Sequence, residues 1–437
     1  MTTDDQQAPA RTRTHHVALV HDGTVWSEDG ALPTFVHADE DDDPTRTATR
    51  HVADGVHAAP PIPLPQPDES VRADLLHVLA LRGHPDGVAG GAWLPVGDLA
   101  EPFGARVGTA LAQHSGSAPP QRPDWFQAGW YDRVEAWIDD CLSARGRRRT
   151  EPVRTHRVWS ISAVLEVPTS DGTLWFKACC DHFRAEAAIL HRLSQRLPGL
   201  VPIVVAADDA EGWLLMEPLA GASDRAEGAA EALAPVWAAA QLASLAWLDE
   251  LRAAGCPDRG LGPTLAAWRD VLAHDPEMAL LTEDDRAAVL GAADEVEERV
   301  REFWSTGLPD TLAHGDLHPG NVAYDGQTLR LFDWTDACIS HPFLDGSHLA
   351  YFVASDDAGA DADQQLAAFA EPWREAYPEA DVDRALALAP LADLVFQTVT
   401  FAAIAAATED GAGDFTGTVA YLVKASARRV GALPAET

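Results

Sequence analysis

The chain has 437 residues, enough for two to three domains of about 150 residues each, so it needs neither disulfides nor a metal to fold. Its 32 Lys and Arg residues are outnumbered by 68 Asp and Glu residues, and the net charge of −36 argues against nucleic acid and anionic membrane surfaces as partners. The five cysteines have no disulfide or metal-ligand spacing, no signal-peptide pattern opens the chain, and no apolar run reaches membrane-spanning length. We therefore predict a cytoplasmic protein without a membrane segment.

The first third of the chain predicts a small α/β domain over residues 15–122, preceded by a disordered tail at 1–14. Two short strands joined by a turn are predicted at 16–26, and a helical apolar pattern covers 70–81. The acidic run at 39–43 and the Pro-rich run at 59–67 are interpreted as surface loops.

Residues 123–150 predict a linker helix, because apolar residues recur there at spacings of three and four. Residues 151–220 predict a small β-rich lobe in the order strand, strand, helix, strand, strand, with the first strand over 153–167. Residues 221–437 predict a mainly helical lobe, interrupted by two short strands at 321–332. The predicted fold class is therefore α+β, with two lobes after the N-terminal domain.

The segment AHGDLHPGNVAYDGQTLRLFDW, residues 313–334, holds the side chains with the clearest chemistry. Asp333 and Asn321 offer the oxygen ligands that Mg²⁺ prefers, with substrate phosphates and water completing its coordination. Asp316, on the loop before the strands, can accept the proton of an attacking hydroxyl and orient it toward a phosphoryl group.

This segment resembles the aminoglycoside phosphotransferase and choline kinase-like branch of the kinase fold, through HGDLHPGN and the following DW. The resemblance extends from about residue 151 to the C-terminus and implies a bilobal kinase-like fold that binds ATP and Mg²⁺. It implies that Asp316 is the catalytic base and that Asn321 and Asp333 bind Mg²⁺.

The resemblance also implies a nucleotide site in the smaller lobe. Lys177 matches the strand lysine that contacts the phosphates, and Glu186 matches the helix glutamate that holds this lysine. A surface ion pair is the alternative for these two residues. The segment WLLMEPLAG resembles the hinge that binds adenine, and because Pro218 has no N–H, the predicted contacts are the carbonyl of Glu217 and the N–H of Leu219.

Other candidate residues have supporting roles. Ser160 and Ser162 stand where protein kinases have a glycine-rich phosphate loop, although a plain strand face explains them equally well. His314 and His318 are interpreted as hydrogen-bonding residues of the catalytic loop, since Mg²⁺ selects oxygen ligands. Asp345 resembles the buried aspartate that supports that loop in kinase folds.

Two departures from known patterns are informative. Gly315 replaces the Arg of the protein-kinase HRD motif, which argues against regulation by loop phosphorylation and favours a small-molecule acceptor. The N-terminal domain weakly resembles a Nudix-type domain, but Arg50, His51, Val52 and Ala53 stand where that family has catalytic glutamates. We therefore expect a scaffold or binding module that does not hydrolyse pyrophosphate.

The leading prediction is an ATP- and Mg²⁺-dependent phosphotransferase that acts on a hydroxyl of a small molecule. An aminoglycoside or other amino sugar is favoured because an acidic lobe attracts a polycation, although an acidic surface that serves solubility explains the charge equally well. Neutral sugars, nucleosides, choline-like amino alcohols and macrolides stay open as acceptors. The alternative from another class is a nucleotide-binding pseudokinase or sensor, and the sequence predicts no oligomeric state.

Overall fold

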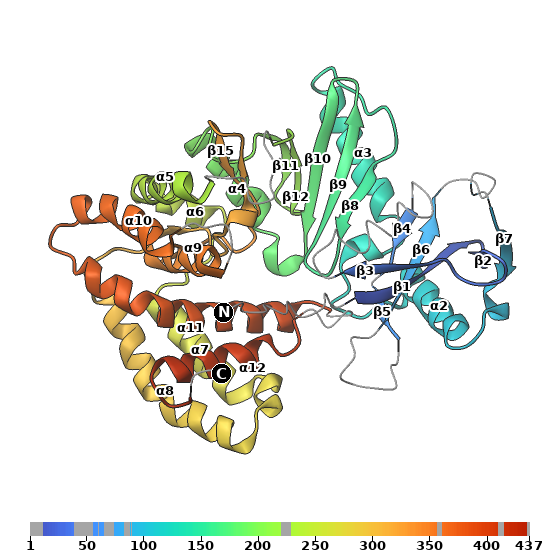
Figure 1. Cartoon of the computed structure of the whole chain (residues 1–437). Coiled ribbons are helices and arrows are strands. Elements are labelled where there is room, and N and C mark those ends of the chain that lie inside the picture. The colour runs from blue at the N-terminus through green and yellow to red at the C-terminus, as the bar shows by residue number, and fades with distance from the viewer. Residues whose placement is uncertain are drawn as a thin grey trace, which may run out of the picture. The chain divides into compact units, whose positions relative to one another are not determined.

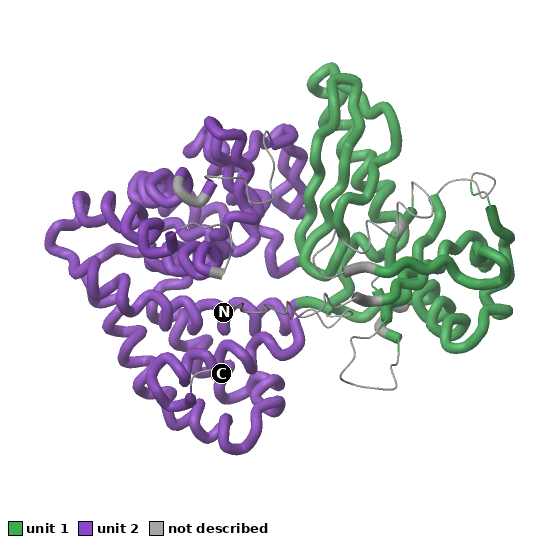
Figure 2. The backbone as a smooth tube through the Cα atoms, in the orientation of Figure 1, with its two compact units in different colours: residues 1–180, 408–414 green, residues 181–407, 415–437 purple. Residues whose placement is uncertain are grey.

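The computed structural model divides the chain into two compact units, residues 1–180 with 408–414 and residues 181–407 with 415–437 (Figure 2). It describes residues 12–38, 56–59, 61–64, 74–82, 88, 90–219, 229–355, 361–409 and 415–434. The acidic run at 39–43 and most of the predicted tail lie outside the described residues. Residues 12–14 of that tail belong to the first strand.

Unit 1 begins with a seven-stranded sheet, in which five strands follow the order β4-β6-β1-β2-β7, β3 pairs with β1 and β5 pairs with β6 (Figure 1). The central pair β1 and β6 is parallel, whereas the other pairs are antiparallel. The strands are β1 (Thr12–His21), β2 (Thr24–Ser27), β3 (Thr34–Ala38), β4 (Val56–Ala58), β5 (Ile62–Pro63), β6 (Leu75–Leu81) and β7 (Ala92–Pro95).

The predicted hairpin of β1 and β2 is confirmed, whereas the helix predicted over 70–81 is wrong. Residues 75–81 of that stretch form β6, a run of seven residues in which His77 is the one polar side chain. A run this short fits both a buried strand and a helix, and here its backbone groups pair with β1 on one side and with β4 and β5 on the other. Tertiary pairing therefore overrides the helical pattern.

The described part of unit 1 contains two α-helices, α2 (Phe103–Ala112) and α3 (Trp130–Ser143). The second is the amphipathic helix expected within 123–150, and its buried face includes Trp130, Val134 and Ile138. The rings of Trp130 and Trp137 approach the ring of Phe176 edge-on, with centroids 5.9 and 6.0 Å away. This helix therefore packs on the strand that contains Lys177.

Unit 1 ends with three antiparallel strands: β8 (Arg154–Val158), β9 (Ser162–Thr169) and β10 (Gly172–Cys179). The single strand predicted over 153–167 is two strands. A bend separates them, and the backbone N–H of Trp159 donates to the carbonyl of Ser162 at 3.1 Å to close it. A turn at Ser170 and Asp171 joins β9 to β10.

Unit 2 is mainly helical, as predicted, and the α+β fold class is confirmed (Figure 1). Its helices are α4 (Glu186–Arg196), α5 (Ala229–Ser244), α6 (Leu248–Ala253), α7 (Leu261–His274), α8 (Glu283–Trp304), α9 (Phe343–Ser355), α10 (Ala362–Ala376), α11 (Val382–Ala407) and α12 (Thr418–Arg429). Its strands form three antiparallel pairs: β11 (Val204–Asp208) with β12 (Trp213–Met216), β13 (Thr311–Ala313) with β16 (Cys338–Ser340), and β14 (Val322–Tyr324) with β15 (Leu329–Leu331).

Six shorter helical turns complete the described elements. They are η2 (Val96–Asp98), η3 (Gln113–Ser117) and η4 (Asp124–Phe126) in unit 1, and η5 (Asp181–Phe183), η6 (Pro276–Leu280) and η7 (Pro319–Asn321) in unit 2.

Two apolar clusters hold unit 2 together. The larger one surrounds the segment of β13 to β16 and includes Trp237, Trp334 and Phe343, each with no more than 1% of its surface exposed. The smaller one joins helices α7, α8, α11 and α12. The short strands of the predicted catalytic segment are therefore fixed by packing on all sides, which restricts their motion.

Within the described residues, α11 is the one helix long and apolar enough to span a membrane, and 61% of its apolar window is buried inside the protein. The helix packs against α7, α8, α9 and α12. A helix that is apolar on all faces is expected at such a central position in a helical core.

Candidate active site

The catalytic loop follows β13 and turns sharply at Gly315, where φ is +85°. A Cβ atom at this position would lie 2.3 Å from the carbonyl oxygen of Asp336. Only glycine combines this backbone conformation with so close an approach. The glycine that distinguishes this loop from the protein-kinase HRD motif is thus required by the local geometry.

Asp345, at the start of α9, supports this loop through hydrogen bonds to its backbone. Its carboxylate accepts hydrogen bonds from the backbone N–H groups of His314 and Gly315 at 2.8 and 3.0 Å. It also accepts from the indole of Trp237 at 2.7 Å and the amide of Gln241 at 3.1 Å. Burial raises the pKa of Asp345 to about 6, although these hydrogen bonds act in the opposite direction.

His314 is fully buried within the loop. Its Nε2 lies 3.1 Å from the carbonyl oxygen of Phe332, and its ring packs on Trp334 with centroids 4.7 Å apart. Burial lowers the pKa of His314 to about 4, so the imidazole is neutral near pH 7. His314 therefore joins the catalytic loop to β15 and the residues that follow it.

Asn321 ends η7 and contacts Asp316 twice. Its Nδ2 donates to the backbone carbonyl of Asp316 at 2.9 Å and to the carboxylate at 3.1 Å. Both amide hydrogens are used, which leaves Oδ1 as the atom that can coordinate a cation. The backbone N–H of Phe332 donates to the carbonyl of Asn321 at 3.0 Å, so Asn321 is tied to the residue that precedes Asp333.

Asp333 has a left-handed backbone conformation, with φ at +61°. Non-glycine residues adopt this region at an energetic cost and do so mainly where the surrounding structure enforces it. Here the next backbone N–H, that of Trp334, donates to Glu186 on α4 at 2.9 Å, and Thr335 Oγ1 donates to the Asp333 carboxylate at 3.0 Å. Glu186 is thus placed against the Asp333 segment.

The residues present fit a magnesium ion bound together with a nucleotide. Among the described residues, no group of three or more His, Cys, Asp or Glu side chains suits a metal. Mg²⁺ needs only one or two protein oxygens when phosphates supply further ligands. The Oδ1 of Asn321 and the carboxylate of Asp333 offer that number and type of atom.

Asp316 is held by two histidines. Nε2 of His348 lies 3.1 Å from one carboxylate oxygen, and Nε2 of His318 lies 3.5 Å from the other. Burial alone would raise the pKa of Asp316, but these two histidines hold it well below its usual range. Its side chain stays 40% exposed, so a charged carboxylate faces the space around the loop.

The contacts of His348 with Asp393 and Gln397 were not predicted from the sequence. Nδ1 of His348 lies 3.5 Å from the carboxylate of Asp393 and 3.3 Å from the amide of Gln397, which also donates to the carbonyl of Gly315 at 3.1 Å. Burial lowers the pKa of His348, but Asp393 and Asp316 together raise it to about 10. One signal was present: His348 stands three residues after Asp345, on the same face of one helix.

The predicted nucleotide residues are distributed over both units. Lys177 lies on β10 opposite Val164 and is 7% exposed. Ser160 lies in the bend before β9, and the hydroxyl of Ser162 accepts the indole N–H of Trp159 at 2.9 Å. These residues belong to unit 1, whereas the remaining three predicted nucleotide residues, Glu186, Glu217 and Leu219, belong to unit 2.

The hinge candidates follow β12. The backbone N–H of Glu217 donates to the carbonyl of Ile203 at 3.0 Å, so it continues the pairing of the β11 and β12 hairpin. This bond uses the N–H of Glu217 and does not involve its carbonyl, which is the group predicted to contact adenine.

Residues 181–381 match the family model described as the phosphotransferase enzyme family. The chain is similar to that family over this region. The resemblance stated from HGDLHPGN and DW is thereby confirmed for this phosphotransferase region, which includes Asp316, Asn321 and Asp333. The Nudix-like resemblance of the N-terminal domain stays a prediction.

Several solved structures are similar to the chain at low identity. A fructosamine-3-kinase-type protein from Thermobifida fusca is 22% identical, with a TM-score of 0.44, covering 68% of this chain and 98% of its own. A choline/ethanolamine kinase family protein from Mesorhizobium loti is 17% identical, with a TM-score of 0.46, covering 69% and 95%. A macrolide 2'-phosphotransferase from Brachybacterium faecium is 18% identical, with a TM-score of 0.43, covering 69% and 99%. No curated protein sequence matches the chain.

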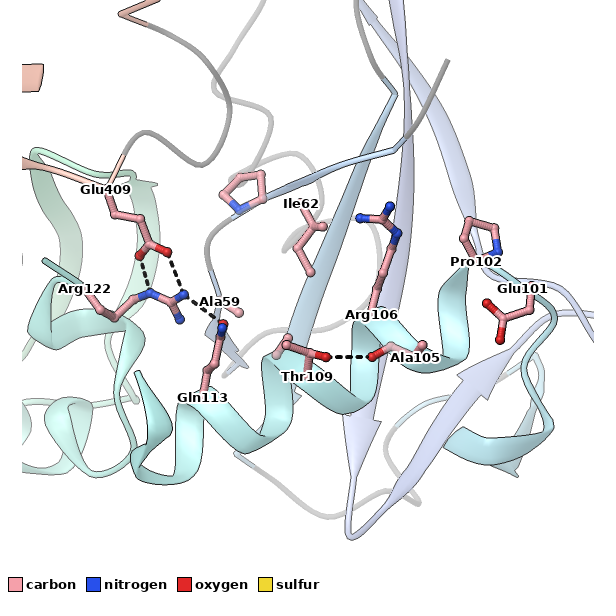
Figure 3. A pocket seen from close by; sticks show the side chains of 12 residues that line it. Ala59, Ile62, Glu101, Pro102, Ala105, Arg106, Thr109, Gln113, Arg122 and Glu409 are labelled. Carbon is pink, nitrogen blue, oxygen red and sulfur yellow. Dashed lines mark hydrogen bonds and ion pairs between the residues drawn. The ribbon is translucent and has the colours of Figure 1, made fainter. Parts of the chain in front are cut away.

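A cavity of about 580 Å³ lies apart from the phosphotransferase region, in unit 1, beside α2 (Figure 3). Arg122 on its wall is 7% exposed and forms a two-pronged ion pair with Glu409, while also donating to Gln113 at 2.9 Å. These bonds use three of the five N–H donors of the guanidinium. This contact attaches Glu409, which follows α11 in the chain, to the first unit.

Proposed function

We propose that the protein is an ATP- and Mg²⁺-dependent phosphotransferase that moves the γ-phosphoryl group to a hydroxyl of a small molecule. The observation that carries the proposal is the arrangement around Asp316. A charged, partly exposed carboxylate is hydrogen-bonded to Asn321, whose remaining oxygen is suited to a cation. This is the constellation that phosphoryl transfer needs, within a region that matches a phosphotransferase family.

In this proposal Asp316 accepts a hydrogen bond from the acceptor hydroxyl and aims its oxygen at the γ-phosphorus. A carboxylate with a lowered pKa is a weak base, so it orients the hydroxyl early and takes the proton late. That timing suits the loose transition state of phosphoryl transfer, in which positioning and charge stabilisation dominate. His348 and His318 fix the carboxylate in this orientation.

Asn321 and Asp333 would hold the magnesium ion, which when bound neutralises the phosphate oxygens. The strained backbone at Asp333 and the hydrogen bond from Trp334 to Glu186 set the direction of the Asp333 carboxylate before substrate arrives. Such preorganisation avoids a reorganisation cost during the reaction.

The nucleotide site is proposed from the smaller lobe and the hinge. Lys177 contacts the phosphates, Ser160 and Ser162 contribute through a hydroxyl or backbone N–H, and the backbone of Glu217 and Leu219 receives adenine. Glu186 accepts the N–H of Trp334 and so connects α4 to the proposed metal-binding segment. The proposed location is the cytoplasm.

The experiment combines ATP, Mg²⁺ and the full chain with a panel of amino sugars, neutral sugars, nucleosides, amino alcohols and macrolides, and detects phosphoryl adducts by mass. Asp316→Asn should lower turnover by about 10²- to 10⁴-fold while nucleotide affinity stays nearly constant. Unchanged turnover in this variant would contradict the role of Asp316. Tight ATP binding without an adduct from any class would favour the sensor alternative.

A further inference from the structure

A second cavity, of about 820 Å³, lies in unit 2 and includes Asp316 in its wall. Helices α9, α10, α11 and α12 supply the rest of the wall. The volume is within the range of about 300–1,000 Å³ that is usual for small-molecule sites. Because the proposed base opens into this space, the acceptor hydroxyl must enter here if the proposed function is correct.

Most of the wall is apolar. The larger side chains are aromatic or aliphatic: Tyr351, Phe352, Leu394, Phe401, Tyr421 and Leu422. Tyr351 is 59% exposed and Tyr421 is 49% exposed, so both rings offer apolar surface that an occupant of the cavity can cover. An occupant with an apolar body would remove this surface from water and gain the corresponding free energy.

The charges of the wall are balanced, in contrast to the whole chain. Its carboxylates are Asp316 and Asp393, and His348 lies between them, within 3.1 and 3.5 Å. The last turn of α12 adds the guanidinium groups of Arg428 and Arg429. The wall therefore has no surplus of negative charge, although the chain has a net charge of −36.

A polycationic acceptor would fit this wall poorly. Each ammonium group that leaves water needs a carboxylate or several acceptors to compensate its desolvation. Asp393 is 8% exposed, and one of its oxygens is paired with His348, so only its Oδ1 is left to compensate an ammonium group. Asp316 is needed for the reacting hydroxyl. The two arginines repel further positive charge.

We propose that the acceptor is an uncharged hydroxyl compound with an apolar body, such as a glycoside of an apolar group. This inference rests on the proposed function and differs from the amino-sugar acceptor favoured by the net charge. The acidic surplus then lies on other surfaces, where it serves solubility.

The test measures binding to the full chain by calorimetry. Mg²⁺ is present, and a non-hydrolysable ATP analogue takes the place of ATP. Three probes separate the contributions: glucose, octyl β-glucoside below its micelle concentration, and kanamycin. Octyl β-glucoside should bind with one-to-one stoichiometry and at least tenfold more tightly than glucose, and kanamycin should bind more weakly than octyl β-glucoside.

Two variants place a carboxylate in the wall, Leu394→Asp and Tyr421→Glu, and neither residue belongs to the proposed catalytic set. Each should weaken octyl β-glucoside binding at least tenfold. The matched control is Leu290→Asp, because Leu290 is 45% exposed on α8 and is not part of the wall. This control should bind octyl β-glucoside as the wild type does. The use of two wall variants keeps the test valid if one of them folds poorly.

The inference would be overturned if kanamycin bound more tightly than octyl β-glucoside. It would also be overturned if octyl β-glucoside did not bind, or if the wall variants bound it as the wild type does. The proposed function is tested separately, by the Mg²⁺ dependence of nucleotide binding in Asp333→Ala. Loss of that dependence together with tight kanamycin binding would leave the phosphotransferase proposal intact and reject only the acceptor class. Retention of the dependence would count against the metal site, whichever probe binds.

Discussion

Replacement of Gly315 by alanine tests how the catalytic loop is held. The new Cβ would lie 2.3 Å from the carbonyl oxygen of Asp336 and 2.8 Å from its Cβ, both far inside van der Waals contact. The left-handed backbone alone costs alanine about 1 kcal/mol. Removing the overlap requires a shift of buried backbone, and such overpacking typically costs a further 1–3 kcal/mol, about 2–4 kcal/mol in all.

Gly326 supplies the matched control, because it has the same kind of backbone without the close contact. Its φ is +91°, compared with +85° for Gly315, and nothing lies within 4 Å of a Cβ built there. Gly326→Ala should therefore cost only the backbone term, about 1 kcal/mol. The difference between the two variants isolates the contact with Asp336.

The assay is urea unfolding of both variants. Nucleotide binding and turnover are measured separately, in urea-free buffer at pH 7. Gly315→Ala should unfold at lower urea concentration than Gly326→Ala and should lose turnover to a greater degree than it loses nucleotide affinity, since the displaced loop bears Asp316. Equal stability of the two variants would refute the argument that the approach of the loop to Asp336 fixes its position.

Three further outcomes are expected. Asp345→Asn should lower the free energy of unfolding by about 1–3 kcal/mol in urea titrations, because its amide leaves at least one of the buried N–H donors of His314 and Gly315 without an acceptor; unchanged stability would contradict this. The raised pKa of His348 stabilises the fold below pH 6.5, and this contribution is lost as the pH rises through about 10. The free energy of unfolding should therefore be lower at pH 9.5 than at pH 7, and His348→Asn should reduce this difference. Asp333→Ala should abolish the Mg²⁺ dependence of nucleotide binding, measured by titration with the metal, and persistent dependence would exclude Asp333 as a ligand.

The candidate catalytic segment could be located from the sequence because its polar residues lie close together in the chain. Asp316, Asn321 and Asp333 lie within 18 residues, and the structure connects the first two directly and the third through the backbone of Phe332. Asp345 was also identified, since it follows the segment closely. Its hydrogen bonds to His314 and Gly315 agree with a supporting position.

The supporting contacts from distant elements could not be predicted in the same way. Asp393 and Gln397 lie on a helix almost 80 residues after Asp316, and their polar character in a mainly apolar helix was the only local signal. The prediction for β6 was wrong for a similar reason, because β6 pairs with β1, which lies far earlier in the chain. Local periodicity cannot distinguish a buried strand from a buried helix when the run is short and mostly apolar.

Under the acceptor class proposed above, net charge is a poor guide to the acceptor, for a physical reason. The −36 of the chain is a sum over the entire surface, and at physiological salt a charge is felt over only about 8 Å. An acceptor in the cavity therefore interacts with the few charges on its wall, and Asp316, Asp393, His348 and the two arginines of α12 nearly cancel there. Distant carboxylates can speed the approach of a cation, but they cannot compensate the free-energy cost of its desolvation in the cavity. The preference of this site thus depends on the local pairing of Asp393 with His348, which total composition cannot reveal.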